Sequence, residues 1–236
     1  MTSIAVIPAR GGSKRIPRKN VRLFHGQPAI ARSIQTALNS DCFDRVIVST
    51  DDREIADIAR QHGAEIPFMR PDSLADDYTT TQAVIRHSIE ALDLQDSCDA
   101  SICCIYPVTP FLKGSRIKEG LQLLLNSEYE FVASVMDYDY PVQRALRIEA
   151  SHIEMIQGEN LVVRTQDLDE IVHDAGQFYW GWSTSWLADA PIFQAATGAI
   201  KLDRTEAVDI DTEADWRWSE ALFDYQTRAQ SCYRFG

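Results

Sequence analysis

Acidic side chains are missing from the first forty residues of this chain, although the sequence as a whole is strongly acidic. Aspartate and glutamate number 35 and lysine and arginine 23 among the 236 residues, which gives a formal net charge of −12. The acid-free segment carries seven bases: Arg10, Lys14, Arg15, Arg18, Lys19, Arg22 and Arg32. In the rest of the chain, 16 bases face 35 acids. A protein of this charge repels nucleic acid and anionic membranes as a whole, so the function of the basic segment has to be local.

Long apolar runs and paired cysteines are also missing. No run approaches the roughly 18 residues that a membrane-spanning helix requires, and the start, MTSIAVIPARGG, has no basic residues ahead of its apolar stretch, which is typical of a strand and not of a secretory signal. The five cysteines include no C-x-x-C pair and are Cys42, Cys98, Cys103, Cys104 and Cys232. Cys103 and Cys104 lie in an apolar run, which favours buried thiols over a disulfide framework or zinc site. We expect a cytoplasmic protein with no membrane or nucleic-acid partner.

The hydrophobic pattern indicates an α/β fold. A composition of 45% hydrophobic and 25% charged residues excludes disordered, collagen-like and coiled-coil chains. Strands are predicted at 3–8, 45–50, 66–69, 100–106 and 130–136, and helices at 28–38, 52–62, 80–92 and 114–125. This alternation predicts a mostly parallel sheet. Ligands of such sheets bind beyond the carboxyl ends of the strands, which selects the loops after Pro8, Thr50, Tyr106 and Met136.

Residues 137–174 break this alternation. They form short β-like pieces separated by turn signals such as GlnGlyGluAsn, which predicts a β-rich arm inserted into a single domain that covers residues 1–236. After the arm, the pattern predicts a helix over 184–188, a strand over 196–202 and a closing helix from 213 to about 225.

The loop PARGGSKRIPRKN, which follows the first predicted strand, has the residues of a phosphate site. Its paired glycines can turn backbone N–H groups toward one point, and Arg10, Lys14 and Lys19 can neutralise a polyphosphate there. The spacing matches neither a Walker A loop nor G-x-G-x-x-G, so hydride transfer to a dinucleotide is not expected. A solvated basic loop or a nucleic-acid patch is the less favoured alternative, because the cations directly follow a buried strand and few aromatics lie among them.

The segment VDIDTE places two carboxylates two residues apart. On an extended chain Asp209 and Asp211 point to one face while Ile210 faces the core. Such hard oxygen ligands suit Mg²⁺, which keeps water molecules and shares phosphate oxygens with one or two carboxylates. Alternatively, Asp211 or Thr212 caps the following helix. The motif alone leaves both interpretations open.

The segment DAGQFYWGW combines polar and aromatic residues. Asp174 and Gln177 are placed to hydrogen-bond a sugar, whereas Trp180 and Trp182 are more typical of a core or an interface. Aspartates and threonines at 51–52 and 76–81 suit either a nucleotide site or helix caps. The histidines show no ligand spacing, and no serine–histidine or cysteine–histidine pair indicates covalent catalysis.

Taken together, IPARGGSKRIPRKN resembles the N-terminal signature of the CMP-sialic acid synthetase family, cytidylyltransferases that activate nine-carbon 2-keto sugar acids. The resemblance continues through RVIVSTDD, FMRPDSLADD, IYPVTPF and VDIDTEAD, in the family's order and over most of the chain. YPVQRALRI and DAGQFYWGW look most like members that use pseudaminic acid. Sialate-activating members carry a Gln-Pro-Thr-Ser-Pro turn and an Asn-Gly-Ala-Ile-Tyr segment, which are replaced here by YPVTP and DAGQFY. These departures argue against N-acetylneuraminic acid as the substrate.

The resemblance implies a Rossmann-like nucleotidyltransferase fold, a homodimer in which the 137–174 arm crosses to the partner, and the Mg²⁺-dependent reaction CTP + pseudaminic acid → CMP-pseudaminic acid + diphosphate. Lys19, Arg10 and Lys14 would be catalytic, and Asp209 and Asp211 would bind the metal. The nucleotide contacts would be Ala9, Arg10, Gly11, Gly12, Ser13, Lys14, Lys19, Asn20, Arg70 and Thr81. The sugar contacts would be Gln143, Arg144, Asp174, Gln177 and Tyr179.

Two of these assignments have alternatives. Arg144 suits the sugar carboxylate and equally an ion pair between subunits. The same reaction on legionaminic acid, N-acetylneuraminic acid or Kdo, a nucleotide-sugar binding protein without activity, and an RNA-binding protein are the other functions to be tested.

Overall fold

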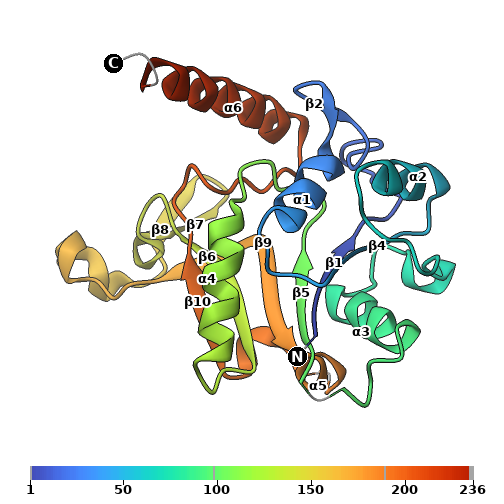
Figure 1. Cartoon of the computed structure of the whole chain (residues 1–236). Helices are drawn as coiled ribbons and strands as arrows, with labels where there is room; N and C mark the ends of the chain where they lie inside the picture. Colours follow the sequence, from blue (N-terminus) through green and yellow to red (C-terminus); the bar gives the residue numbers. More distant parts are fainter. Residues whose placement is uncertain (1, 98, 189, 234–236) are drawn as a thin grey trace.

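The computed structural model describes residues 2–97, 99–188 and 190–233. Within them a six-stranded sheet has the order β10-β6-β9-β5-β1-β4 (Figure 1). In chain order its strands are β1 (Ser3–Pro8), β4 (Arg45–Ser49), β5 (Ser101–Ile105), β6 (Phe131–Asp137), β9 (Val172–Trp182) and β10 (Thr197–Lys201). β1 is parallel to β4 and β5, and β6 is parallel to β10. The predicted α/β fold with a mostly parallel sheet is confirmed.

β9 is the antiparallel strand, and the arm explains its direction. β6 ends where Asp137 pairs with Val172 at the start of β9, so the chain leaves and re-enters the sheet at the same end and must run back between β5 and β6. The excursion therefore covers 138–171, because the outer residues of the predicted 137–174 segment already belong to the sheet. The arm contains a hairpin of β7 (Leu146–Glu149) and β8 (His152–Met155) and projects beyond the sheet edge (Figure 1).

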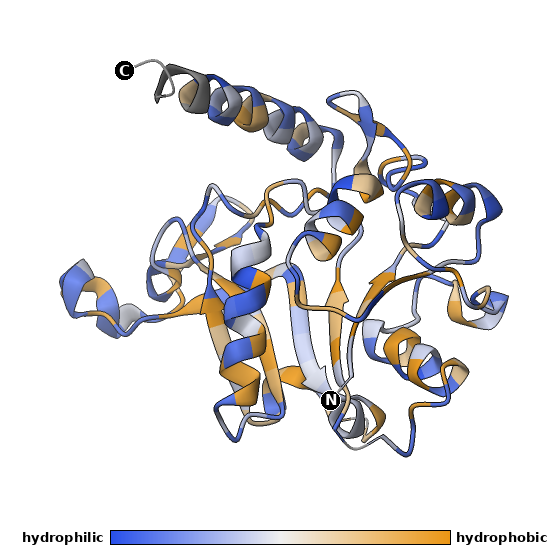
Figure 2. Ribbon diagram, viewed as in Figure 1, coloured by the Kyte–Doolittle hydropathy of each residue, from blue (hydrophilic) through white to orange (hydrophobic). Residues whose placement is uncertain are grey.

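Helices cover both faces of the sheet. Buried side chains place α1 (Ala29–Leu38), α2 (Arg53–Gln61) and α4 (Gly114–Leu125) on one face, and α3 (Thr81–Ala91) and α5 (Ser183–Leu187) on the other. Figure 2 shows hydrophobic residues along several strands of the sheet, whereas much of α2 is hydrophilic.

Successive strand residues point to opposite faces, and the two cysteines of β5 follow this rule. Cys103 belongs to the cluster under α1, α2 and α4, and Cys104 to the cluster under α3 and α5. Both are buried, unpaired thiols, as predicted, and so is Cys42. Cys98 and the side chain of Cys232 lie outside the described residues.

Two predicted elements need correction. The strand predicted at 66–69 is wrong: Glu65 makes one bridge to Ile47, and the chain then bends, because Pro67 has no N–H with which to continue a ladder. The closing helix α6 (Glu213–Tyr233) is longer than predicted, since no glycine or proline interrupts it. Its first half packs through Trp216 and Leu222.

The remaining elements are short. The two-stranded ribbon of β2 (Leu23–Phe24) and β3 (Gln27–Pro28) leads into α1, and 3-10 turns occur at Asp72–Leu74, Val142–Arg144, Gly158–Leu161, Thr165–Asp167 and Ile192–Gln194. In the described part of the chain, no helix combines the length and hydrophobicity needed to cross a membrane.

Candidate active site

Cavities follow the carboxyl ends of the strands, as expected for this fold, and three of them contain predicted site residues. The loop cavity, of about 450 Å³, lies beside the basic loop after β1 and is lined by Pro8, Arg10, Ser13, Lys14, Arg15, Ile16, Lys19, Asn20, Asp77, Pro107 and Asp211. The Arg70 cavity, of about 170 Å³, shares Pro8, Arg10 and Pro107 with it and adds Arg70, Thr79, Thr81, Val84 and Tyr106. The Asp174 cavity, of about 240 Å³, is lined by Met136, Asp139, His173, Asp174, Ala175, Arg204, Ala207, Val208, Asp209 and Trp218.

Two cations of the loop cavity converge on one carboxylate. Arg10 Nη1 donates to Asp77 Oδ1 and to the Asp76 carbonyl, both at 2.7 Å, and Lys14 forms an ion pair with Asp77. These contacts, from Lys14 and then Arg10, lower the pKa of Asp77. An anionic oxygen thus already occupies the point at which Arg10 and Lys14 meet, which marks this point as an anion site.

The opposite wall of the loop cavity joins the basic loop to the VDID segment, about 190 positions later in the chain. Lys19 Nζ donates to the Ile210 carbonyl at 2.7 Å and lies 3.6 Å from Asp211 Oδ1. Arg15 Nη1 lies 2.7 Å from Asp211 Oδ2. Partial desolvation and the neighbouring Asp211 raise the pKa of Asp209. The cations of this wall therefore face the Asp211 carboxylate, and Asp209 lines the adjoining Asp174 cavity.

Of the two helix caps that the VDIDTE segment allowed, Thr212 is confirmed and Asp211 is not. Thr212 Oγ1 accepts from the N–H of Asp215 at 3.3 Å, and Asp215 Oδ2 accepts from the N–H of Thr212 at 2.7 Å. This reciprocal capping box begins α6 and leaves the Asp211 carboxylate facing Arg15 and Lys19.

The two aspartates fit a magnesium ion that is completed by water and phosphate. The described residues contain no group of three or more histidine, cysteine, aspartate or glutamate side chains able to enclose a metal. A closed protein cage is thus not available in this part of the chain. Mg²⁺ commonly takes one or two carboxylates and keeps several waters, which is the donor set that Asp209 and Asp211 provide.

The Arg70 cavity is built around a buried guanidinium. Arg70 is only 5% exposed, its Nε donates to Ser49 Oγ at 3.2 Å, and its Nη2 donates to the Ser49 carbonyl. Burial lowers its pKa to about 10, so the group still carries its charge at neutral pH. Thr81 Oγ1 and the Tyr106 hydroxyl lie 3.1 Å apart on the adjoining wall.

The lining of the Asp174 cavity is half polar and half apolar, and its polar half includes three aspartates. The Tyr179 hydroxyl donates to Asp174 Oδ2 at 2.6 Å, and Asp174 Oδ1 accepts from the N–H of Gly176 at 2.9 Å. Asp209 lines the same cavity, so this cavity and the loop cavity meet along the 208–211 segment. Tyr179 itself is buried behind Asp174 and orients its carboxylate.

Not every predicted residue reaches these cavities. Ala9 is buried, and the Gly11 N–H donates to Asp51 Oδ1 at 3.0 Å, so this donor is already engaged. Asn20 lines the loop cavity and donates to the Arg10 carbonyl at 2.9 Å. Gly12 is absent from the lining of all three cavities.

The predicted sugar contacts of the arm lie elsewhere. Gln143 Nε2 donates to the Asp169 carbonyl, and Arg144 Nη2 to the Val163 carbonyl, both at 2.7 Å within the arm. Gln177 is 1% exposed. None of these three side chains lines the cavities described above.

The cavities also contain residues that the sequence analysis did not assign as ligand contacts. Among them are Arg15, Tyr106, Arg204 and Trp218. Tyr106 sits at the end of β5, where the position of the strand end was a usable signal. Arg204 and Trp218 come from a loop and a helix that no motif connects with the site.

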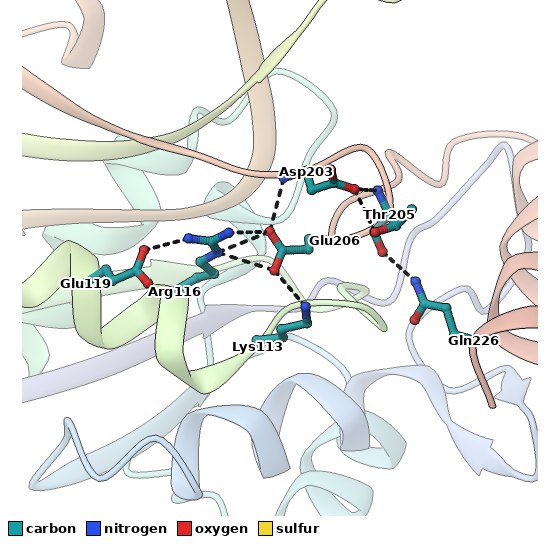
Figure 3. Close-up of polar contacts among 7 residues, drawn as sticks. All are labelled: Lys113, Arg116, Glu119, Asp203, Thr205, Glu206 and Gln226. Carbon is teal, nitrogen blue, oxygen red and sulfur yellow. Dashed lines mark hydrogen bonds and ion pairs between the residues drawn. The ribbon is translucent and has the colours of Figure 1, made fainter. Parts of the chain in front are cut away.

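An ion-pair network fixes the loop that carries the two aspartates (Figure 3). Glu206 is only 4% exposed. Its carboxylate accepts from Arg116 Nη2 at 2.9 Å, from Lys113 Nζ at 2.8 Å and from the N–H of Asp203 at 3.1 Å. Lys113 and Arg116 lie at the start of α4. The network thus ties the turn after β10, three residues before Asp209, to the start of α4.

This network predicts an acid-dependent stability. Burial alone would raise the pKa of Glu206, but hydrogen bonds from Arg116 and Lys113 outweigh it and lower the pKa from 4.5 to about 2. A carboxylate whose pKa is lower in the folded than in the unfolded protein stabilises the fold at pH values above the unfolded pKa. This stabilisation is lost as the pH falls toward the folded-state pKa. We expect Glu206→Gln to cost about 3 kcal/mol of unfolding free energy at pH 7, and this cost to shrink between pH 4.5 and pH 2. Urea denaturation across this range measures it.

Glu119→Gln is the matched control, because Glu119 is an exposed partner of the same Arg116. Exposed pairs contribute at most about 1 kcal/mol. A Glu206→Gln effect that stays constant from pH 7 to pH 2 would contradict the assignment.

Comparison with known proteins agrees with this geometry. A family model described as cytidylyltransferase matches residues 4–179, and the chain belongs to this family. The pseudaminic acid cytidylyltransferase of Campylobacter jejuni is 39% identical, over 94% of this chain and 97% of that protein. The CMP-N,N'-diacetyllegionaminic acid synthase of Legionella pneumophila is 31% identical, over 97% of this chain and 99% of that protein.

A solved structure supports the fold. The CMP:2-keto-3-deoxy-manno-octonic acid synthetase complexed with CTP superposes with a TM-score of 0.71, over 96% of this chain and 100% of that chain, at 15% sequence identity. The nucleotidyltransferase fold predicted from the resemblance is therefore confirmed.

Proposed function

We propose that this protein is a pseudaminic acid cytidylyltransferase that catalyses CTP + pseudaminic acid → CMP-pseudaminic acid + diphosphate. The observation that carries the proposal is the contact of the cationic loop with the Asp209–Asp211 segment, between a cavity built on Arg70 and a cavity built on Asp174. In this arrangement the Arg70 cavity suits the base and ribose, the loop cavity suits the triphosphate, and the Asp174 cavity suits the sugar. The similarity to the Campylobacter jejuni enzyme supports the choice of sugar.

The triphosphate takes the loop cavity. Its oxygens replace the Asp77 carboxylate opposite Arg10 and Lys14, which then neutralise the phosphate chain. The Ser13 hydroxyl on the same wall is available as a further donor. A cluster of fixed cations at this place lowers the energy of the leaving diphosphate, on which negative charge develops.

The nucleoside takes the Arg70 cavity. The guanidinium of Arg70 remains charged and is held by Ser49, so its outward N–H groups meet the carbonyl oxygen of a pyrimidine. The hydroxyls of Thr81 and Tyr106 lie beside it. Asn20, through the Arg10 carbonyl, fixes the backbone at the junction with the loop cavity.

The reaction is an in-line displacement that depends on position and charge. The C2 hydroxyl of the sugar attacks the α-phosphorus, and diphosphate leaves from the opposite side. Lys19, which donates to the Ile210 carbonyl at 2.7 Å, lies beside the α-phosphate. Mg²⁺ held by Asp209 and Asp211 would neutralise phosphate oxygens and lower the pKa of the attacking hydroxyl. Asp174, oriented by Tyr179, accepts hydrogen bonds from the sugar.

A diphosphate-release assay tests the proposal. The full chain is incubated with CTP and, in turn, pseudaminic, legionaminic, N-acetylneuraminic acid and Kdo, with and without Mg²⁺. We expect release with pseudaminic acid and Mg²⁺. The 31% identity to the Legionella pneumophila synthase makes legionaminic acid the second candidate. CTP binding without release from any sugar would overturn the transferase and leave a binding protein. The buried unpaired thiols suit a reducing compartment, so we place the reaction in the cytoplasm.

We also propose that the enzyme is a homodimer joined through the arm. The arm carries several exposed apolar side chains, which suits an interaction surface: Leu146, Ile148, Ile153, Ile156, Leu161 and Val162. Ile148→Glu is expected to convert the dimer to a monomer in sedimentation analysis, and Leu125→Glu, at an exposed site of α4, to leave it intact. A monomeric unmodified chain would contradict this assignment.

A further inference from the structure

The Asp174 cavity carries an excess of negative charge, which is unfavourable for binding a sugar acid. Its lining contains three carboxylates, those of Asp139, Asp174 and Asp209. A sugar acid is itself an anion, so three aspartates would repel it. Among the described residues that line this cavity, Arg204 is the only lysine or arginine.

Arg204 is available to a ligand in the present arrangement. Its Nη2 lies 2.8 Å from Asp139 Oδ1, and the two side chains are 71% and 63% exposed. An ion pair this exposed holds its partners weakly, so an incoming carboxylate can replace Asp139 at little cost. The guanidinium presents two parallel N–H donors, which match a carboxylate in a bidentate pair.

The backbone beneath Arg204 is fixed. Asp203 and Glu206 close a turn in which the Glu206 N–H donates to the Asp203 carbonyl at 2.7 Å, and Lys113 and Arg116 hold the Glu206 carboxylate (Figure 3). The side chain is therefore free to reorient, whereas its Cα stays beside the cavity.

We propose that Arg204 binds the C1 carboxylate of the sugar acid and so selects an acid as the acceptor; this inference rests on the proposed function. The carboxylate of a 2-keto sugar acid is bonded to C2, the carbon whose hydroxyl attacks the phosphate. It must therefore lie close to the reacting atoms and to Asp209, which lines the same cavity. Arg204 is the cation found there, and it offsets the repulsion by the three aspartates.

The proposal replaces Arg144, the residue that sequence analysis suggested for the carboxylate. Arg144 Nη2 donates to the Val163 carbonyl at 2.7 Å inside the arm, and Arg144 is absent from the lining of the Asp174 cavity. The two arginines give opposite expectations for the same measurement.

The test compares Arg204→Gln and Arg144→Gln by steady-state diphosphate release at saturating CTP and Mg²⁺. Arg204→Gln is expected to raise KM for the sugar acid at least about tenfold and to change KM for CTP less than about twofold. Arg60→Gln is the matched control, because Arg60 also forms an exposed ion pair, with Asp57 on α2. Arg204→Lys keeps the positive charge but loses the paired N–H donors of the guanidinium. Its KM for the sugar acid is expected to lie between those of Arg204→Gln and Arg60→Gln.

A second readout separates a carboxylate contact from a general loss of structure. The C1 carboxamide of the same sugar should react poorly with the unmodified enzyme, and Arg204→Gln should use acid and carboxamide about equally well. A sugar-acid KM for Arg204→Gln equal to that of Arg60→Gln, or an increase found only in Arg144→Gln, overturns the proposal while the transferase function stands.

If the unmodified enzyme releases no diphosphate with any sugar, the proposed function fails. Calorimetric titration with the sugar acid then decides separately on Arg204. A dissociation constant about tenfold higher for Arg204→Gln than for the unmodified enzyme supports a contact between Arg204 and the carboxylate. Equal dissociation constants, or no binding to the unmodified enzyme, would overturn it.

Discussion

Asp211→Asn is expected to lower kcat/KM for diphosphate release by about 10³-fold or more, equivalent to about 4 kcal/mol of transition-state stabilisation. The substitution keeps the size of the side chain and removes the charge that Arg15 and Lys19 face at 2.7 and 3.6 Å. It leaves the start of α6 intact, because Thr212 and Asp215 form that cap. Activity should respond far less to Mg²⁺ concentration, which a Mg²⁺ titration of the rate measures.

Asp224→Asn is the control for this change, since Asp224 is an exposed carboxylate on α6 that pairs with His25 at 3.7 Å. Both variants should unfold at nearly the same temperature as the unmodified chain. Asp211→Asn with full turnover and an unchanged Mg²⁺ requirement would contradict the proposal that Asp211 binds Mg²⁺.

Lys19→Met is expected to reduce kcat by about 10² to 10³, with a smaller effect on KM for CTP. The ammonium group is fixed by the Ile210 carbonyl at 2.7 Å, so it is oriented before the substrate binds and costs no reorganisation during the reaction. Loss of a group that acts on developing charge lowers kcat more than it weakens ground-state binding. Rapid-quench measurement of a single turnover tests whether the chemical step is the one affected.

The neighbouring Arg18 provides a matched control in the same loop. Its guanidinium binds Asp52 and Glu54 at the start of α2, and Arg18 is absent from the lining of the loop cavity. Arg18→Gln should keep kcat within a few-fold. Equal losses from the two variants would show that the loop needs positive charge in general and not Lys19 in particular.

The fold was largely predictable, because buried parallel strands and amphipathic helices leave strong local patterns. β1, β4 and α4 were predicted within about one residue. The direction of β9 was not predictable, since it depends on where the arm returns to the sheet. The false strand at 66–69 has the right composition, but Pro67 and the bend after Glu65 prevent pairing.

Site residues could be predicted where they are neighbours in the sequence and form a motif. They could not be predicted where the fold brings together residues that are far apart in the sequence. The basic loop and the VDID segment were found separately, and the pairing of Arg15 with Asp211 follows only from the fold. Nothing local marks Arg204, whose importance comes from the cavity around it. Conversely, the sequence around Arg144 suggested a ligand contact, but its hydrogen bond stays inside the arm.

The carboxylate of Asp77 competes with anions for Arg10 and Lys14. Any anion that enters the loop cavity must displace a tethered group already bound by Arg10 and Lys14. A monophosphate exchanges one anion for another of similar charge, whereas a triphosphate brings enough charge to engage Lys19 and Arg15 as well. An anion that exchanges with Asp77 therefore gains mainly through the contacts it makes beyond Arg10 and Lys14, which favours a polyphosphate over a monophosphate.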